Sequence, residues 1–387
     1  MGGEDSGAAL LERDGALSVL QAAFGGVVAG QGAVVLVSGE AGIGKTSLVR
    51  AFVAAERRAT RVLAGACDDL AVPRPLGPFL EIAHELPGLA SELGTGGVDA
   101  PRVVLDELRR DGATICIVED AHWADEATID VLTFVARRVE ATSSLLLVSF
   151  RDDEIGPEHP LRRALAATAV DRTYRLELER LSVEAIARLA GATVDAEALR
   201  AITGGNPFFV REALASGPGR TPASVRDAVL ARAARLTEGA RAVAELVSVH
   251  PVRVPLSLLE ECAASVDAGL AEAERGGLLE LDHDLVGFRH ELARWAIEES
   301  LAGPRRRDLN LAVLRVLERR EAAPARLAHH AWAAGDADAI VRHGLAAAHA
   351  AVAAHSHREA QTLLIRVLEH GHLLAPRERA AALELLP

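Results

Sequence analysis

Lysine is almost absent from this sequence. Its 387 residues include 42 lysines and arginines, yet Lys45 is the single lysine. A compact ammonium on a flexible stem reaches between phosphate groups where a planar guanidinium fits differently. The position of this one lysine therefore marks a candidate phosphate-binding site.

Cysteine is scarce as well. Cys67, Cys116 and Cys262 lie far apart without a C-x-x-C spacing, which argues against a disulfide framework and a zinc site. The simplest interpretation is a protein of the reducing cytoplasm. The N-terminus lacks a basic start followed by an apolar run, and no apolar stretch of about 18 residues occurs, so we expect neither secretion nor membrane spanning.

Positive charge is not concentrated in any segment. The formal net charge is −13, and arginines are interspersed with aspartate and glutamate, so no basic stripe suited to a nucleic-acid backbone stands out. Half of the residues are hydrophobic and 25% are charged, as in a folded globular protein. At roughly 100 to 200 residues per domain, the length allows two to four domains.

In the first half, strand-like apolar runs alternate with helical periodicity. A helix is predicted over residues 10–30, and further helical periodicity covers residues 47–55 and 127–139. Buried strands are predicted at residues 33–38, 61–64, 114–118 and 144–149, the last of these being the final strand of the sheet. This alternation indicates a parallel sheet with helices on both faces.

After residue 176 strand-like runs nearly vanish. Helices are predicted at 182–190 and 196–203, and Pro207 in the GGNP sequence ends the second of them. Residues 217–222 have the composition of a linker. Alternating apolar and polar residues around 282–284 suggest a β-hairpin wing, and Ala-rich amphipathic helices at 325–334 and 336–355 resemble a helix-hairpin repeat.

The sequence GEAGIGKT at residues 39–46 fits the phosphate-binding loop pattern G-x-x-x-x-G-K-[ST] completely. It lies between an apolar strand and an apolar helix, the context that this loop requires. Gly39, Gly42 and Gly44 allow the backbone N–H groups to face phosphates at a helix N-terminus. We expect Lys45 to reach the β- and γ-phosphates, Thr46 to hold Mg²⁺, and the neighbouring Ser47 to belong to the same site.

Two carboxylates follow the strand at 114–118. Glu119 and Asp120 have the position of a Walker B pair, in which one carboxylate holds Mg²⁺ and the other polarises the attacking water. The sequence leaves the two roles open between them. A solvated acidic strand end is the alternative interpretation.

Arg151 comes directly after the strand at 144–149. At this place it would lie near the γ-phosphate and could respond to it by a charge-assisted hydrogen bond. A salt bridge to Asp152 or Asp153 is the alternative. Packing in apolar surroundings is the default interpretation for Trp123 and Trp295.

Five segments together resemble the ATPase module of the large ATP-binding LuxR-type regulators, which are signal-transducing ATPases of the STAND class. The likeness covers most of residues 8–300. It rests on GEAGIGKT at 39–46, CDDLAVPRPLGP at 67–78, VEDAHWAD at 118–125, SFRDDE at 149–154 and GGNPFF at 204–209.

The resemblance implies an α/β P-loop NTPase fold at residues 1–175, followed by a helical lid at 176–220, a winged-helix-like domain at 221–300 and a TPR-like helical segment at 301–387. It further implies that Pro207 touches the nucleotide from the lid, that Arg13 lies beside the adenine, and that His290 contacts the β-phosphate of ADP. A helix-capping role is the alternative for His290.

The function implied is a switch that binds ATP or ADP with Mg²⁺ and hydrolyses ATP slowly. ADP would hold the lid and winged helix closed. Exchange for ATP, assisted by a protein partner or small-molecule inducer on the C-terminal helices, would open the molecule for self-assembly. The sequence has no N-K-x-D motif for reading guanine, which agrees with an adenine nucleotide.

No DNA-reading element is expected in this chain, because the helix-turn-helix typical of such regulators is not seen before Pro387. The chain would then be a fragment or a short relative. The winged-helix-like region is also acidic, which argues against groove binding; its acidic residues include Glu260, Glu261, Asp267, Glu272 and Glu274. Two alternative functions are an ATPase module coupled to a cyclase or kinase, and a protein-interaction scaffold with a structural nucleotide.

Overall fold

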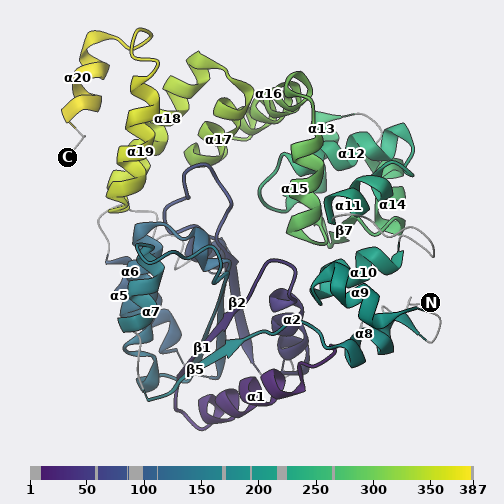
Figure 1. Ribbon diagram of the computed structural model, residues 1–387. Helices are drawn as coiled ribbons and strands as arrows, with labels where there is room; N and C mark the ends of the chain where they lie inside the picture. Colours follow the sequence, from purple (N-terminus) through teal and green to yellow (C-terminus); the bar gives the residue numbers. More distant parts are fainter. Residues whose placement is uncertain are drawn as a thin grey trace.

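The computed structural model describes residues 10–56, 60–84, 86, 99–110, 112–167, 171–191, 194–215, 225–263 and 266–384. The predicted linker at 217–222 lies outside these ranges. Within them, the chain forms a sheet domain followed by helical regions (Figure 1).

The N-terminal domain contains a five-stranded parallel sheet in the order β2-β3-β4-β1-β5. The strands are β1 (Ala33–Ser38), β2 (Arg61–Ala66), β3 (Thr114–Glu119), β4 (Ser144–Phe150) and β5 (Thr173–Glu177). All four predicted strands are confirmed, and the parallel α/β fold with them. The expectation that β4 is the last strand was wrong, because β5 adds an edge strand whose half-exposed residues lack a continuous apolar run.

Helices cover both faces of the sheet, as the alternating pattern predicted. On one face α1 (Asp14–Val28) and α2 (Lys45–Glu56) pack against alternate residues of β1, β3 and β4. The opposite face is covered by α3 (Gly77–His84), α5 (Ala100–Leu108), α6 (Glu126–Ala136) and α7 (Pro160–Ala167). With both faces covered, β1, β3 and β4 are nearly continuous buried apolar runs.

Three short helices follow the sheet, namely α8 (Val183–Ala190), α9 (Ala196–Thr203) and α10 (Pro207–Ala215). Gly204 ends α9 in the left-handed conformation, and Pro207 opens α10. Apolar residues of α8, α9 and α10 form a small core of their own. These three helices together are called the lid.

The next region combines five helices with an antiparallel sheet of order β6-β8-β7. Its elements are α11 (Val225–Ala233), α12 (Glu238–Ser248), β6 (Val254–Pro255), α13 (Leu256–Cys262), α14 (Val266–Arg275), β7 (Leu279–Asp282), β8 (Leu285–Phe288) and α15 (Glu291–Ser300). The predicted hairpin is therefore present, with His283 in the left-handed conformation at its turn.

The remaining helices are α16 (Gly303–Arg319), α17 (Pro324–Ala334), α18 (Ala337–Ala353), α19 (His357–Leu368) and α20 (Pro376–Glu384). Gly335 adopts a left-handed conformation between α17 and α18, and the side chain of Asp336 accepts a hydrogen bond of 3.0 Å from the Ala339 amide. Residues of α16, α17 and α18 share one apolar core with the winged-helix-like region.

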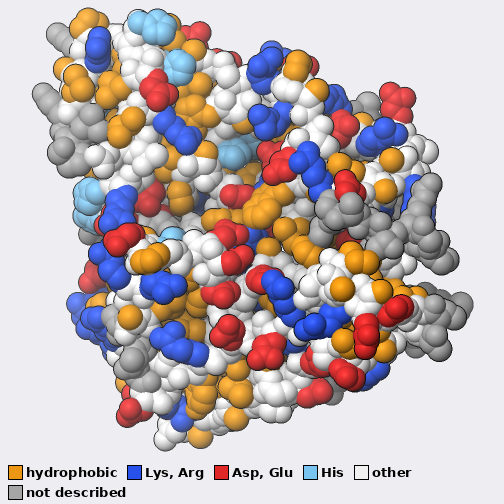
Figure 2. Space-filling model, viewed as in Figure 1, with side chains coloured by type: hydrophobic (Ala, Val, Ile, Leu, Met, Phe, Trp, Pro, Cys, Tyr) orange, Lys and Arg blue, Asp and Glu red, His pale blue; other side chains and the backbone are white. Residues whose placement is uncertain are grey.

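Figure 1 shows these helices arching from the winged-helix-like region back to the sheet domain, where α19 lies near α6. Through this contact the C-terminal helices return to the sheet domain, and the chain forms a ring in this view. On the face seen in Figure 2, acidic and basic side chains are interspersed without a continuous basic stripe. None of the described helices is both long and apolar enough to cross a membrane.

Candidate functional site

The loop between β1 and α2 has the backbone that the glycine pattern predicted. Gly39, Gly42 and Gly44 have φ angles of +143°, +77° and +101°, a region that disfavours other residues. A Cβ on Gly42 would lie 2.9 Å from the Phe208 Cβ, so lid and loop approach each other closely here. Ser47 is exposed in the first turn of α2.

Lys45 is folded into this loop. Its Nζ donates hydrogen bonds to the carbonyl oxygens of Gly39 at 2.6 Å and Glu40 at 3.0 Å. An ammonium has three N–H donors, so one remains for a further acceptor. Burial lowers the pKa of Lys45, and the nearby Asp120 opposes that shift.

Thr46, in the first turn of α2, meets Glu119 at the carboxyl end of β3. The Thr46 hydroxyl donates a hydrogen bond of 2.7 Å to Oε2 of Glu119. A hydroxyl oxygen and a carboxylate oxygen thus lie together beside the loop, the kind of hard oxygen donors that Mg²⁺ accepts.

Asp120 has the left-handed conformation, with φ +53° and ψ +41°, directly after β3. Its backbone N–H donates to Oγ of Ser149 on β4 at 3.3 Å. Burial, reinforced by the charge of Glu119, raises the pKa of Asp120 to about 6.

His122 lies next to the carboxylate of Asp120. Its Nδ1 is 3.9 Å from Asp120 and its Nε2 is 3.5 Å from Glu154. Burial lowers the pKa of His122 to about 2, so the ring is neutral and these contacts are not ion pairs.

Arg151 is almost fully buried and is held between aromatic rings. Its guanidinium carbon lies 4.8 Å from the ring centroid of Trp123 and 4.7 Å from that of Trp295. Its Nη1 donates to Glu154 at 2.5 Å, so the described ion partner is neither Asp152 nor Asp153. Trp123 and Trp295 do pack, but they pack around this cation.

The lid contacts the loop through the residues on either side of Pro207. Asn206 Nδ2 donates to the Ala41 carbonyl at 2.9 Å, and the Phe208 amide donates to the Gly42 carbonyl at 3.3 Å. Asn206 is 2% exposed and also caps Phe208 through its Oδ1. The sequence pattern singled out the proline and not its two neighbours, although an asparagine just before a helix is a recognisable capping signal.

Arg13 connects the loop to the chain that leads into the lid. Its Nη2 donates to the carbonyl oxygens of Ile43 at 3.1 Å and Glu179 at 2.8 Å. Glu40 and Arg180 form an ion pair across the same junction. A cavity of about 410 Å³ beside it is lined by both of these residues, Asn206 and parts of α9 and α10.

The winged-helix-like region approaches the loop through the start of α15. His290 is the residue before this helix, and its ring lies 4.4 Å from the ring of Phe208 without capping the helix by a side-chain hydrogen bond. Burial lowers the pKa of His290 to about 4. The neighbouring Leu292 has Cδ1 3.1 Å from the place that a Gly42 Cβ would occupy.

A second contact of α15 involves the segment after β2. Asp69 Oδ2 accepts hydrogen bonds from Trp295 Nε1 at 3.1 Å and from Arg294 Nη2 at 2.6 Å. Arg294 is also paired with Glu291 and Glu298 on its own helix. This contact was not predicted from the sequence, because nothing in the linear pattern relates Asp69 to a helix more than 200 positions later.

The residues gathered here fit a nucleotide with its magnesium ion. Three glycines with positive φ leave room at the N-terminus of α2, where backbone N–H groups and the helix dipole favour anions. Lys45 supplies a cation, and Thr46 with Glu119 supplies oxygen donors.

Comparison with known proteins agrees with this geometry. The family model of the AAA ATPase domain matches residues 9–148. An uncharacterized protein of Rhizobium meliloti (strain 1021) is 25% identical over 459 aligned residues, covering 98% of this chain and 44% of that protein. The chain thus spans less than half the length of this curated relative.

Among solved structures, a STAND protein with a tetratricopeptide repeat sensor from Pyrococcus horikoshii matches with a TM-score of 0.62 and 17% identity, covering 94% of this chain and 57% of that one. Cdc6p from Pyrobaculum aerophilum matches with a TM-score of 0.40 and 14% identity, over 81% of this chain and 96% of that one. This chain therefore contains an AAA ATPase domain at residues 9–148, within a fold that it shares with a STAND protein.

Proposed function

We propose that this chain is a signal-transduction switch that binds ATP and ADP with Mg²⁺ and hydrolyses ATP slowly. One observation carries the proposal: the lid contacts the loop at 39–46 directly, and α15 contacts both this loop and Arg151. A site built only for rapid turnover has no need for a second domain packed onto it. Contacts of this kind let a bound nucleotide bias the arrangement of the domains.

In this proposal Thr46 and Glu119 hold the metal ion, because their oxygens already meet through a hydrogen bond. Mg²⁺ held by these residues would neutralise part of the phosphate charge. Asp120 then has the role of orienting the attacking water and accepting its proton. Its backbone is left-handed and its N–H donates to Ser149, whereas the hydroxyl of Thr46 donates to Glu119.

Arg151 is proposed as the group that responds to the γ-phosphate. In the closed arrangement its charge is balanced by Glu154 and lies between Trp123 and Trp295. A γ-phosphate would compete for this guanidinium through stronger charge-assisted hydrogen bonds. Because Trp295 belongs to α15, that competition would loosen the winged-helix-like region. His290, beside Phe208, would loosen with it.

The LuxR-type regulatory role is part of this proposal, with the motifs at 39–46, 67–78, 118–125, 149–154 and 204–209 as its support. An inducer or protein partner on the C-terminal helices would favour opening, and the opened chains would self-associate. The helical arch also supports a second candidate, a scaffold in which the nucleotide has only a structural role. An ATPase module serving a cyclase or kinase would use the same switch.

Nucleotide binding and hydrolysis by the purified chain, compared with a Lys45→Ala variant, test the proposal. ATP, ADP and GTP should be assayed in parallel with Mg²⁺. We expect wild type to bind adenine nucleotides in preference to GTP and to turn over slowly. The variant should bind at least about tenfold more weakly, since a charge-assisted hydrogen bond contributes about 1.5–3 kcal/mol.

Arg50→Ala is a matched control, because Arg50 is an exposed cation on the same helix whose described partner is Glu280. It should retain nucleotide binding. Equal binding by wild type and the Lys45 variant would refute a phosphate role for the loop. Tight binding without any turnover would favour the scaffold.

A further inference from the structure

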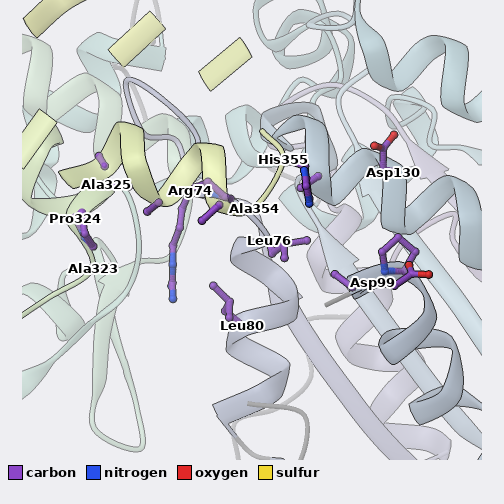
Figure 3. Close-up of a pocket in the computed structure, with 17 residues that line it drawn as sticks. Arg74, Leu76, Leu80, Asp99, Asp130, Ala323, Pro324, Ala325, Ala354 and His355 are labelled. Atoms are coloured by element: carbon purple, nitrogen blue, oxygen red, sulfur yellow. The ribbon is translucent and has the colours of Figure 1, made fainter. Parts of the chain in front are cut away.

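A second cavity, of about 720 Å³, lies between the ATPase domain and the C-terminal helices. Its walls on one side are the segment before α3, α3 itself, and the starts of α5 and α6. On the other side are the start of α17 and the C-terminal half of α18 (Figure 3). None of the loop residues at 39–46 lines it, so it is separate from the nucleotide site.

Small side chains create this space. On the helical side the lining consists mainly of alanines together with Pro324 and His355. Leu76 and Leu80 supply apolar surface from the ATPase domain. A volume of this size falls within the range of pockets that hold small organic molecules, about 300–1,000 Å³.

One cation in the lining, Arg74, has no directly bonded partner among the described residues. Figure 3 shows the Arg74 side chain extending between Leu80 and the start of α17. In the described part of the chain, no hydrogen bond or ion pair involves its guanidinium. The nearby carboxylate of Asp68 lies instead 3.8 Å from Arg326. Burial lowers the pKa of Arg74 and the charge of Arg326 acts in the same direction, whereas the carboxylates of Asp68 and Glu81 oppose this shift.

The opposite end of the cavity is acidic. Asp99 and Asp130 lie there, away from Arg74 in Figure 3. Asp99 uses Oδ1 to cap α5 at the Arg102 amide, 3.3 Å away. The lining therefore has a cationic end, an apolar middle and an end that accepts hydrogen bonds.

We propose that this cavity binds a small organic anion with an apolar body, its acidic group paired with Arg74. The alanine-rich wall accommodates the apolar body. A hydroxyl or amine at the far end of the ligand would be recognised by Asp130. Buried polar groups of this kind fix the orientation of a ligand, and apolar contact supplies most of its affinity.

The position of the cavity connects it to the nucleotide site. Leu76, in its lining, has φ +56° and donates its N–H to Oδ1 of Asp125 at 3.1 Å. Asp125 Oδ2 accepts a 2.6 Å hydrogen bond from Ser356, which follows the cavity residue His355. A ligand in this cavity would therefore lie next to the junction between the segment after β3 and the C-terminal helices. This effect on turnover rests on the proposed switch, whereas ligand binding does not.

The test is direct binding of anilinonaphthalene sulfonate, a fluorescent apolar anion, to the full chain without nucleotide. Decanoate and the neutral decanol then serve as competitors. We expect one saturable site, with decanoate displacing the probe at least about tenfold better than decanol, the ratio that one charge-assisted hydrogen bond supports. Arg74→Gln should remove this preference, and Ala350→Trp should abolish binding by filling the cavity.

Two matched variants serve as controls. Arg163→Gln changes an exposed arginine on α7, and Ala346→Trp places the same ring one turn earlier on α18, outside the cavity. Both should bind the probe like wild type. Probe binding that is unaffected by Arg74→Gln and Ala350→Trp, or equal competition by decanol, would mean only non-specific apolar adsorption and would overturn the site. Binding that follows the expected pattern without changing ATP turnover would support the site and count against the switch.

Discussion

The hydrogen bond between Thr46 and Glu119 helps to divide two roles, holding Mg²⁺ and orienting water, between Glu119 and Asp120. Glu119 accepts a hydrogen bond from the loop hydroxyl, whereas Asp120 has a left-handed backbone whose N–H donates to Ser149. Sequence order alone could not divide the roles, because both residues follow the same strand. The division proposed here depends on which carboxylate reaches Thr46.

Glu119→Gln and Asp120→Asn should therefore fail in different ways. We expect Asp120→Asn to keep Mg²⁺-dependent ATP binding while its hydrolysis falls about a hundredfold or more, the usual effect of losing a general base. Glu119→Gln should lose both hydrolysis and the Mg²⁺ dependence of ATP binding. Titration of nucleotide with and without Mg²⁺, together with single-turnover hydrolysis, separates the two outcomes.

Asp152→Asn is a suitable control, since this nearby carboxylate is exposed and lies outside the Thr46 pair. Its binding and hydrolysis should match wild type. If Asp120→Asn lost Mg²⁺ dependence and Glu119→Gln kept it, the proposed roles would have to be exchanged.

Residues of the contiguous loop could be predicted from sequence because their chemistry depends on neighbours along the chain. Lys45 and the three glycines need only a strand before them and a helix after them. The partners of Arg151 could not be predicted in this way. Glu154 is three residues away, but Trp295 comes from α15 and is brought to Arg151 only by domain packing.

Helix α15 contacts the ATPase domain through one aromatic side chain in particular. Trp295 covers the Arg151 guanidinium and donates a hydrogen bond to Asp69. A cation–π contact of this kind contributes about 0.5–2 kcal/mol, and a hydrogen bond to a charged acceptor contributes about 1.5–3 kcal/mol. The closed arrangement of α15 should therefore be sensitive to this residue.

Trp295→Ala should shift the molecule towards an open arrangement and accelerate ADP release. A loss of about 2 kcal/mol corresponds to a factor of about 30 in the equilibrium. The release rate of a fluorescent ADP analogue measures the effect, and small-angle scattering should detect a larger radius of gyration.

Trp295→Phe keeps a ring over Arg151 and removes only the N–H, so its release rate should fall between those of wild type and the alanine variant. Unchanged ADP release in Trp295→Ala would show that α15 does not restrain the nucleotide site. The folded state of both variants can be checked independently by thermal unfolding.

Elements with strong periodicity were predictable, and one weak element was not. The strands β1, β3 and β4 are buried on both faces and appear as apolar runs. Strand β5 lies at the sheet edge, where polar residues alternate with apolar ones and only β1 pairs with it. Its short sequence, TYRLE, forms a strand because it pairs with the edge of β1. That edge exists only once the rest of the sheet has folded.

At the scale of the whole molecule, the C-terminal helices return to the ATPase domain through a polar junction. Ser356 donates to Asp125, and the Arg358 amide lies 3.4 Å from Oε2 of Glu126. Glu359 lies at the same junction, where one of its carboxylate oxygens is buried without a hydrogen bond. Burial, together with the charges of Asp125 and Glu126, raises the pKa of Glu359 to about 7.

The sign of the resulting pH dependence follows from this raised pKa. Folding favours the protonated form of Glu359, so its contribution to stability is complete below the ordinary carboxyl pKa and is lost as pH rises through about 7. Glu359→Gln should match wild type near pH 5. It should be more stable near pH 8 by on the order of 1 kcal/mol, after allowance for solvent screening of a partly exposed group.

Thermal unfolding of both proteins at the two pH values measures this difference. Glu369→Gln, a change at the C-terminal end of the same helix α19, is the control and should show no such pH-dependent gap. A stability difference between Glu359→Gln and wild type that is equal at both pH values would exclude titration of Glu359 as its cause.

The sequence by itself determined the phosphate-binding loop, the parallel sheet and the succession of helical regions. These follow from short-range rules: glycine conformations, a strand–loop–helix order, and periods of burial along single elements. The tertiary structure alone decided which residues meet across domains. Asp69 with Arg294, Arg151 with Trp295, Asp125 with Ser356, and the cavity around Arg74 all combine segments far apart in the chain. Such contacts depend on how complete domains pack, and local patterns carry no information about that packing.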